Sequence, residues 1–113
     1  MPAKVTWETV RELALALPDV EEATSWGAPA FKRKGKMFTC RPTHKSAEPD
    51  SLVVLLDFME RDLLLRVAPE TYYLKPHYQN YPCVLVRLGN IRKTALRELL
   101  VDSHDYVKHK RKR

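Results

Sequence analysis

The first twenty residues show the spacing of a helix that is apolar along one face. Its apolar residues recur three and four positions apart, which places their side chains on one side of an α-helix. These residues are Val10, Leu13, Ala14 and Leu17. Thr6 is a suitable N-terminal cap, and Pro18 marks the end because proline disfavours helical backbone in the residue before it.

Short apolar runs bounded by turn residues predict strands in the middle of the chain. Residues 29–33 and 37–41 flank Lys34-Gly35-Lys36, which suits a hairpin turn. Residues 51–56 are apolar enough for a central strand, and residues 83–88 form a similar run. We therefore expect a sheet assembled from neighbouring hairpins.

Two further helices complete the pattern. Residues 59–68 follow Asp57, whose charge favours a helix N-terminus, and Pro69 ends the segment. Residues 91–107 carry a partly apolar stripe. The order is helix, three strands, helix, two strands, helix. It predicts a single two-layer α+β domain, in which an antiparallel sheet carries its helices on one face.

Positive charge is concentrated at the C-terminal end. The net charge is +6, yet residues 108–113 alone hold five basic side chains, which leaves fifteen basic and fourteen acidic residues before them. We expect a folded domain at residues 1–107 and a basic tail at 108–113 that is mobile because like charges repel. The acid-free stretch 32–45 holds six more basic residues. They form either a basic patch or an ordinary solvated face.

Length and composition narrow the class of protein. A chain of 113 residues fits one domain, and 44% hydrophobic with 30% charged residues is typical of a soluble globular protein. No apolar run approaches a membrane span, and the first residues lack the apolar core of a secretory signal, so a cytoplasmic location is expected. Cys40 and Cys83 fall in predicted strands, where we expect reduced, structural thiols.

Several short motifs, spread over nearly the whole chain, agree with this fold. They are Leu17-Pro18-Asp19-Val20-Glu21-Glu22, Ser25-Trp26-Gly27-Ala28-Pro29-Ala30-Phe31-Lys32, Gly35-Lys36-Met37-Phe38, Pro76-His77-Tyr78, Tyr81-Pro82 and Val84-Leu85-Val86-Arg87-Leu88. In this order they resemble the MmcQ/YjbR family of small bacterial proteins. The resemblance implies an α-β-β-β-α-β-β-α two-layer arrangement with wing-like hairpins for which DNA binding has been proposed. It implies no reaction or cofactor, and a shared fold does not fix a function.

The sequence has no recognisable catalytic or metal-binding motif. Its histidines lack metal-ligand spacing, since His104 and His109, five positions apart, leave a helix in different directions. The two cysteines are far apart, the glycines stand singly, and no Gly-x-Ser-x-Gly motif is present. We therefore predict a protein that is not an enzyme and that needs no metal or cofactor.

Two aromatic positions have more than one interpretation. His77 is typical of a structural imidazole that bonds a backbone group and fixes its loop, but it also suits ligand contact or acid–base chemistry. Trp26 suits a core or edge position, and alternatively a stacking platform for a ligand.

Three functional hypotheses follow. The first is DNA binding through a basic hairpin and a Tyr/His loop. The residues assigned to it are Lys32, Arg33, Lys34, Lys36, Arg41, Lys75, His77 and Tyr78. The alternative is a protein-interaction module, either a homodimer or a chaperone-like partner-binding domain, that uses Tyr72, Tyr73, Tyr78 and Tyr81. A third is a small-molecule cavity between His77 and Trp26.

Overall fold

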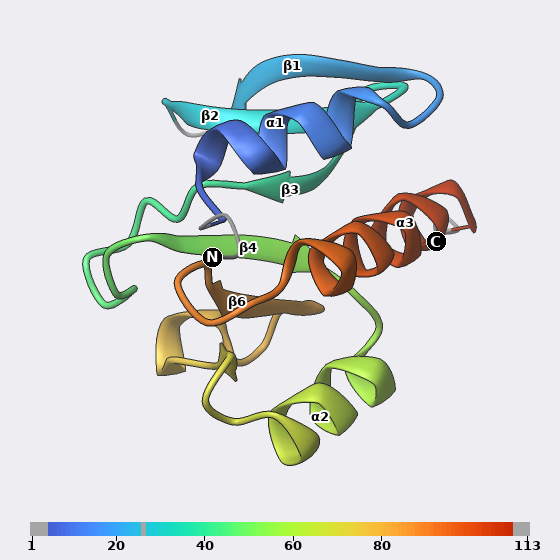
Figure 1. Ribbon diagram of the computed structural model, residues 1–113. Coiled ribbons are helices and arrows are strands. Elements are labelled where there is room, and N and C mark those ends of the chain that lie inside the picture. Colours follow the sequence, from blue (N-terminus) through green and yellow to red (C-terminus); the bar gives the residue numbers. More distant parts are fainter. Residues whose placement is uncertain (1–4, 26, 110–113) are drawn as a thin grey trace.

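The structure, a computed structural model, describes residues 5–25 and 27–109. Within these residues a six-stranded antiparallel sheet carries three α-helices on one face (Figure 1). The elements in chain order are α1 (Trp7–Leu15), β1 (Val20–Ser25), β2 (Ala28–Arg33), β3 (Lys36–Cys40), β4 (Ser51–Leu55), α2 (Phe58–Val67), β5 (Tyr72–Tyr73), the 3₁₀ helix η1 (Pro76–Tyr78), β6 (Cys83–Arg87) and α3 (Lys93–His109).

The strand order in the sheet is β1-β2-β3-β4-β6-β5, so the two central strands are β3 and β4. α1 and α3 cross the sheet side by side, and α2 packs near the β5 edge (Figure 1). The main core lies between the helices and the sheet. Its fully buried members include Val10 and Ala14 of α1, Phe38 of β3, and Leu96 and Leu100 of α3.

The predicted fold class and element order are confirmed, with one strand, β1, preceding the three that the sequence indicates. β1 reads Val-Glu-Glu-Ala-Thr-Ser, which is too polar for an apolar run to announce it. It nevertheless pairs with β2 along its whole length, from Val20 opposite Arg33 to Ser25 opposite Ala28. An edge strand whose backbone hydrogen-bonds to a neighbouring strand needs few apolar side chains of its own.

The helix boundaries follow local signals. Thr6 caps α1 in a capping box with Thr9, whose hydroxyl accepts a hydrogen bond from the Thr6 amide at 3.2 Å. Asp57 caps α2, its carboxylate accepting from the Glu60 amide at 2.8 Å. α3 continues through His109, so Lys108 and His109 belong to a helix and not to a tail. Residues 110–113 of the predicted tail lie outside the described residues.

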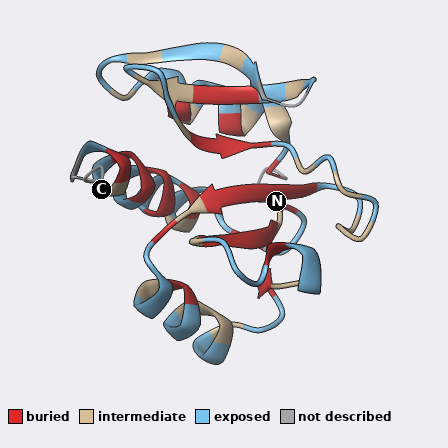
Figure 2. Ribbon diagram, turned by 180° about the vertical axis from the view of Figure 1, so that it is seen from behind, coloured by how far each residue is buried: buried red, intermediate tan, exposed pale blue. Residues whose placement is uncertain are grey.

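A second cluster of buried residues lies on the face of the sheet that no described α-helix covers, hereafter the helix-free face. It contains Ala30, Cys40, Val53, Tyr73, Tyr78, Cys83 and Leu85. A register shift between Phe31 and Lys32 leaves Phe38 without a partner on β2. This bulge allows Met37 and Cys40, three positions apart, to pack on the same, helix-free side. The cover comes from loop 41–50 and η1, seen from that side in Figure 2.

None of the helices in the described part of the chain has the length and apolar character needed to cross a membrane.

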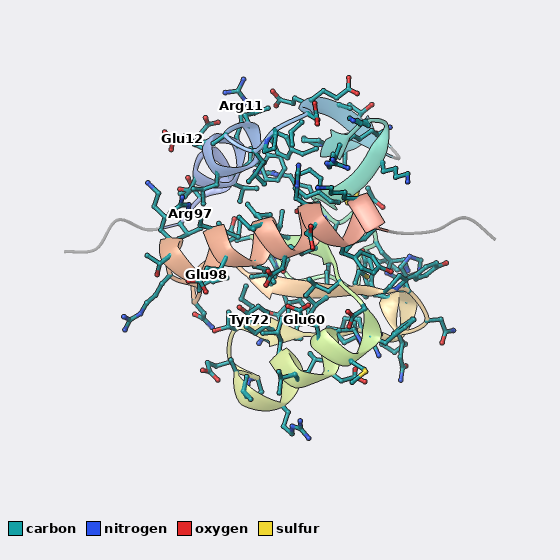
Figure 3. All side chains as sticks on the ribbon, turned by 90° about the vertical axis from the view of Figure 1, so that its right-hand side faces the viewer. Arg11, Glu12, Glu60, Tyr72, Arg97 and Glu98 are labelled. Atoms are coloured by element: carbon teal, nitrogen blue, oxygen red, sulfur yellow. The ribbon has the colours of Figure 1, made fainter. Side chains whose placement is uncertain are left out.

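Two carboxyl groups meet between α2 and α3. Glu60 lies between these helices (Figure 3), and burial, followed by the nearby Asp102 carboxylate, raises its pKa above the ordinary 4.5. Because its pKa is raised in the folded state, Glu60 contributes most to the free energy of unfolding at pH values below its ordinary pKa. This stabilising contribution is lost as the pH rises through the raised pKa. At neutral pH this pair therefore destabilises the fold.

Replacing Glu60 with glutamine is expected to stabilise the domain at pH 7 by about 0.5 kcal/mol, an effect kept small because the site is only half-buried. Near pH 4 the variant and the native protein should have the same free energy of unfolding, because Glu60 is then protonated. Urea unfolding at both pH values measures this difference. Glu12→Gln, at an exposed position of α1 (Figure 3), is the matched control and should change little. An E60Q variant less stable at pH 7 would contradict the expectation.

Candidate functional site

A cavity of about 580 Å³ opens on the helix-free face of the sheet, between loop 41–50 and the segment 76–82, hereafter the tyrosine loop. Its floor is formed by strand residues, namely Met37, Cys40, Val53, Leu55 and Cys83. Its rim is formed by Arg41, His44, His77, Tyr78 and Tyr81. An apolar floor below a small number of aromatic and cationic groups is the usual composition of a ligand-binding cavity.

Two imidazoles stack on each other at the rim. The rings of His44 and His77 lie 3.8 Å apart at an interplanar angle of 13°. Nδ1 of His44 accepts a hydrogen bond from the Ser46 amide at 3.1 Å, so the proton of the neutral ring lies on Nε2. The Tyr78 ring stands edge-on to both, 4.9 Å from His77 and 6.3 Å from His44. The three rings form an aromatic wall of the cavity.

The tyrosine loop is anchored from both sides. On one side Tyr78 is buried, and its hydroxyl accepts a hydrogen bond from the His44 amide at 3.4 Å. On the other side Arg61 of α2, also buried, donates to the carbonyl oxygens of Gln79 at 2.9 Å and Tyr81 at 3.3 Å. The cavity rim is thus held by a side chain from a helix of the opposite layer.

Loop 41–50 is fastened to β5 and β6 by a group of polar contacts. Arg87 makes a two-point ion pair with Glu48, with both nitrogen–oxygen distances 2.8 Å, and its guanidinium lies 4.4 Å from the centre of the Tyr73 ring. The Tyr73 hydroxyl accepts from the Glu48 amide at 2.8 Å and is hydrogen-bonded to Ser51. The Arg87 hydrogen bond holds the pKa of Glu48 below its ordinary value. Both walls of the cavity are therefore fixed.

The two thiols in the cavity floor are in their weakly nucleophilic, protonated form. Burial raises the pKa of Cys40 and of Cys83 to about 11, so both are protonated at neutral pH. β4 separates their strands, since Cys40 lies opposite Val53 and Cys83 opposite Leu55. The expectation of free, buried cysteines is confirmed. Among the described residues, no group of three or more histidine, cysteine or acidic side chains could hold a metal ion.

The basic hairpin adjoins one end of the cavity. Lys36 begins β3 at the hairpin turn, next to Met37 of the cavity floor, and Cys40, also in the floor, ends this strand about 13 Å away at 3.3 Å per residue. Arg33 is largely buried, its side chain 12% exposed, and both Arg33 and Lys34 lie 3.9 Å from the Asp19 carboxylate. Lys32 lies opposite Glu21 on the neighbouring strand. The hairpin charges are therefore partly compensated.

Three of the other predicted site residues line the cavity, with one change of role. Arg41 and His77 line the rim. Lys75 lies two positions before His77 in the chain, with its ammonium 5.9 Å from the Tyr73 ring centre. Tyr78 is buried and shapes the wall instead of contacting solvent. The His77 ring is exposed and stacks on His44, and its role, structural or in ligand contact, stays a prediction.

Three of the four tyrosines assigned to a protein-interaction surface are buried. Tyr72, Tyr73 and Tyr78 are each at most 8% exposed, whereas Tyr81 is 57% exposed. Only Tyr81 is thus available to a partner. Trp26, which the sequence placed across a cavity from His77, lies outside the described residues.

Sequence reasoning missed His44, Lys45 and Arg61 as site residues. His44 and His77 are 33 positions apart, and no local pattern pairs them. Lys45 is exposed beside His44. The acid-free stretch 32–45 was the signal for Lys45, because it placed this lysine in the same charge segment as Arg41. No feature of the sequence indicated Arg61 as a site residue, since helices commonly carry exposed arginines.

A second hollow, of about 620 Å³, lies on the other side of Arg41, whose guanidinium rests 4.9 Å from the Trp7 ring centre. Carboxylates line it, from Glu8, Glu48 and Asp50. It therefore suits an anionic ligand less well than the histidine-rimmed cavity does.

Comparison with known proteins identifies the family. The YjbR family model matches residues 15–106. The chain belongs to the YjbR family. It is 31% identical to uncharacterised proteins of Mycobacterium tuberculosis and Mycobacterium bovis, in alignments that cover 87% of this chain and 84% of each relative.

A solved structure resembles the same fold. The crystal structure of Deinococcus radiodurans protein DR2400, with a domain of the DUF419 model, superposes with a TM-score of 0.77 at 23% identity, covering 97% of this chain and 84% of that one. At this identity the likeness establishes the fold of the YjbR domain alone, and the function has to be argued from the cavity and its charges.

Proposed function

We propose that this YjbR-family chain is a non-enzymatic nucleic-acid-binding domain whose contact surface is the cavity rim on the helix-free face. The carrying observation is the combination of exposed aromatic rings with uncompensated cations. Arg41 lines the cavity, while Lys45 and Lys75 adjoin the two stacked histidines in the chain. None of these three forms an ion pair within the described part of the chain.

Two of the carboxylates near this surface are paired, while Glu8 and Asp50 line the second hollow beside Arg41. Glu48 is held by Arg87 and Asp62 by Arg61, with nitrogen–oxygen distances of 2.8 and 3.0 Å. By contrast, α1 and α3 carry both signs of charge on their exposed faces, as Arg11, Glu12, Arg97 and Glu98 show (Figure 3). A phosphate backbone would therefore meet net attraction at the cavity rim and a mixed field on the helices.

The proposed surface differs from the one predicted from the sequence, because it leaves out the cations of the hairpin. Arg33 and Lys34 are engaged by Asp19, so the proposed surface retains Arg41, Lys75 and His77 from the predicted set and adds Lys45. A non-enzymatic role is supported by the protonated thiols and by the histidine stack. Neither imidazole is hydrogen-bonded to a carboxylate among the described residues. A cytoplasmic location stays a prediction.

The test is the salt dependence of DNA affinity, measured by fluorescence anisotropy with a labelled oligonucleotide. On duplex DNA three phosphate contacts predict a log–log slope of about −2.7, from roughly 0.9 per phosphate, and the four basic residues at 110–113 would add up to about −3.6. A chain in which Lys110, Arg111, Lys112 and Arg113 are replaced by glutamine separates the two contributions. If this variant shows no binding at low salt, the domain surface is not a nucleic-acid site.

A further inference from the structure

The histidine-rimmed cavity has a shape and lining that duplex DNA would leave unused. Its volume of about 580 Å³ lies within the range of ligand-binding cavities, and its floor is made of apolar strand side chains. In a duplex the bases are stacked inside and present only their edges, so their flat faces cannot reach such a floor. An unpaired base exposes both faces and can enter.

The rim supplies surfaces on which a base can stack. His77 is exposed and already stacks on His44 at 3.8 Å, so a base placed on its outer face would extend an existing aromatic stack. Tyr81 is 57% exposed, and its ring centre lies 6.4 Å from that of His77. Stacking of bases on aromatic side chains is the common way in which proteins hold single strands.

Cations adjoin both histidines of this stack in the chain. Lys45 follows His44 in loop 41–50, Lys75 lies two positions before His77, and Arg41 lines the cavity. A strand that inserts a base has a phosphate on either side of it, and this arrangement supplies a positive group for each. The charge distribution therefore complements a single strand whose base points inward.

We propose that the cavity binds an unpaired nucleobase of a single-stranded nucleic acid, with the adjoining phosphates on Arg41, Lys45 and Lys75. This inference rests on the proposed function and specifies its ligand. Because the floor consists of apolar side chains and protonated thiols, it has few fixed groups for reading the edges of a base. Binding is therefore tolerant of sequence.

The experiment compares three DNA probes of equal length by anisotropy: a single strand, the corresponding duplex, and a single strand with abasic sites at its centre. The full chain should bind the single strand at least about tenfold more tightly than either other probe, because base stacking is lost in both. Tyr81→Ala should lower the affinity for the single strand and so remove this preference. Phe58→Ala, which removes an exposed aromatic ring on α2, should keep the preference.

The outcomes separate the inference from the function on which it rests. Equal affinity for the single strand and the duplex overturns the base-binding inference and leaves nucleic-acid binding intact. No binding of any probe overturns both. Retention of full affinity by the abasic strand shows that the phosphates alone are recognised and overturns the inference. Competition by a free mononucleotide at the concentration at which the oligonucleotide competes shows that the ligand is a nucleotide and overturns the single-strand assignment.

Discussion

Replacing Arg61 with methionine is expected to lower the free energy of unfolding by about 2 kcal/mol, the scale of hydrogen bonds to a charged donor in a buried position. Arg61 is 8% exposed and donates to the carbonyls of Gln79 and Tyr81. Methionine fills much of the same space and donates nothing, so the Gln79 carbonyl loses this hydrogen bond and the Tyr81 carbonyl keeps only the one from the Cys83 amide. Lysine at this position should recover little, because it cannot reproduce the forked geometry of the guanidinium.

The same substitution should loosen the cavity rim locally. The Cys83 amide donates to the Tyr81 carbonyl at 2.8 Å, and hydrogen exchange at this amide reports the order of the loop. We expect faster exchange there in the Arg61→Met protein, and no comparable change in Arg66→Met, an exposed position on the same helix. Equal stability and equal exchange in the two variants would show that Arg61 does not hold the loop.

The second large effect concerns binding. Replacing Arg41, Lys45 and Lys75 together with glutamine should weaken duplex DNA affinity at low salt by at least about tenfold and reduce the magnitude of the log–log salt slope by about 2.7. The reason is that the variant lacks three cations of the proposed phosphate-binding surface. Fluorescence anisotropy over a salt series measures both quantities, and circular dichroism confirms that the variant is folded.

A charge-matched control removes the same number of cations from the helical side. Arg92, Lys93 and Arg97 are exposed at the start of α3, and their replacement by glutamine changes the net charge by the same amount. If binding depends on the cavity rim, this control keeps most of its affinity and slope. If the two triple variants lose affinity equally, the effect is one of net charge and the assigned surface is wrong.

The elements with strong local signals could be predicted from the sequence. The spacing of Val10 and Ala14, the cap at Asp57 and the apolar run at residues 51–56 each reflect physics confined to a few neighbouring residues. β1 could not be predicted in this way, because its stability comes from pairing with β2. The predicted order does include two strands before the last helix, but the residues of the two-residue β5 could not be assigned, because this strand depends on pairing with β6. Both lie at sheet edges, where the strand's own composition matters least.

The candidate site was only partly predictable, for a related reason. The sequence indicated that His77, Arg41 and Lys75 were chemically interesting, but the partner of His77 is His44, which loop 41–50 brings across the sheet. It also gave no indication that Tyr72 and Tyr73 are buried or that Asp19 pairs with Arg33. Composition identifies which side chains are available, and the fold decides which of them face solvent together.

The most direct test of the central claim is to map the bound single strand onto the domain by the amide chemical shifts of the protein. The account predicts that perturbations concentrate in loop 41–50 and in the segment 75–83, around Arg41, His44 and His77, and that α1 and the start of α3 stay unchanged. Perturbations confined to α3 and the residues beyond it would contradict the account, since they would place the nucleic acid on the helical side.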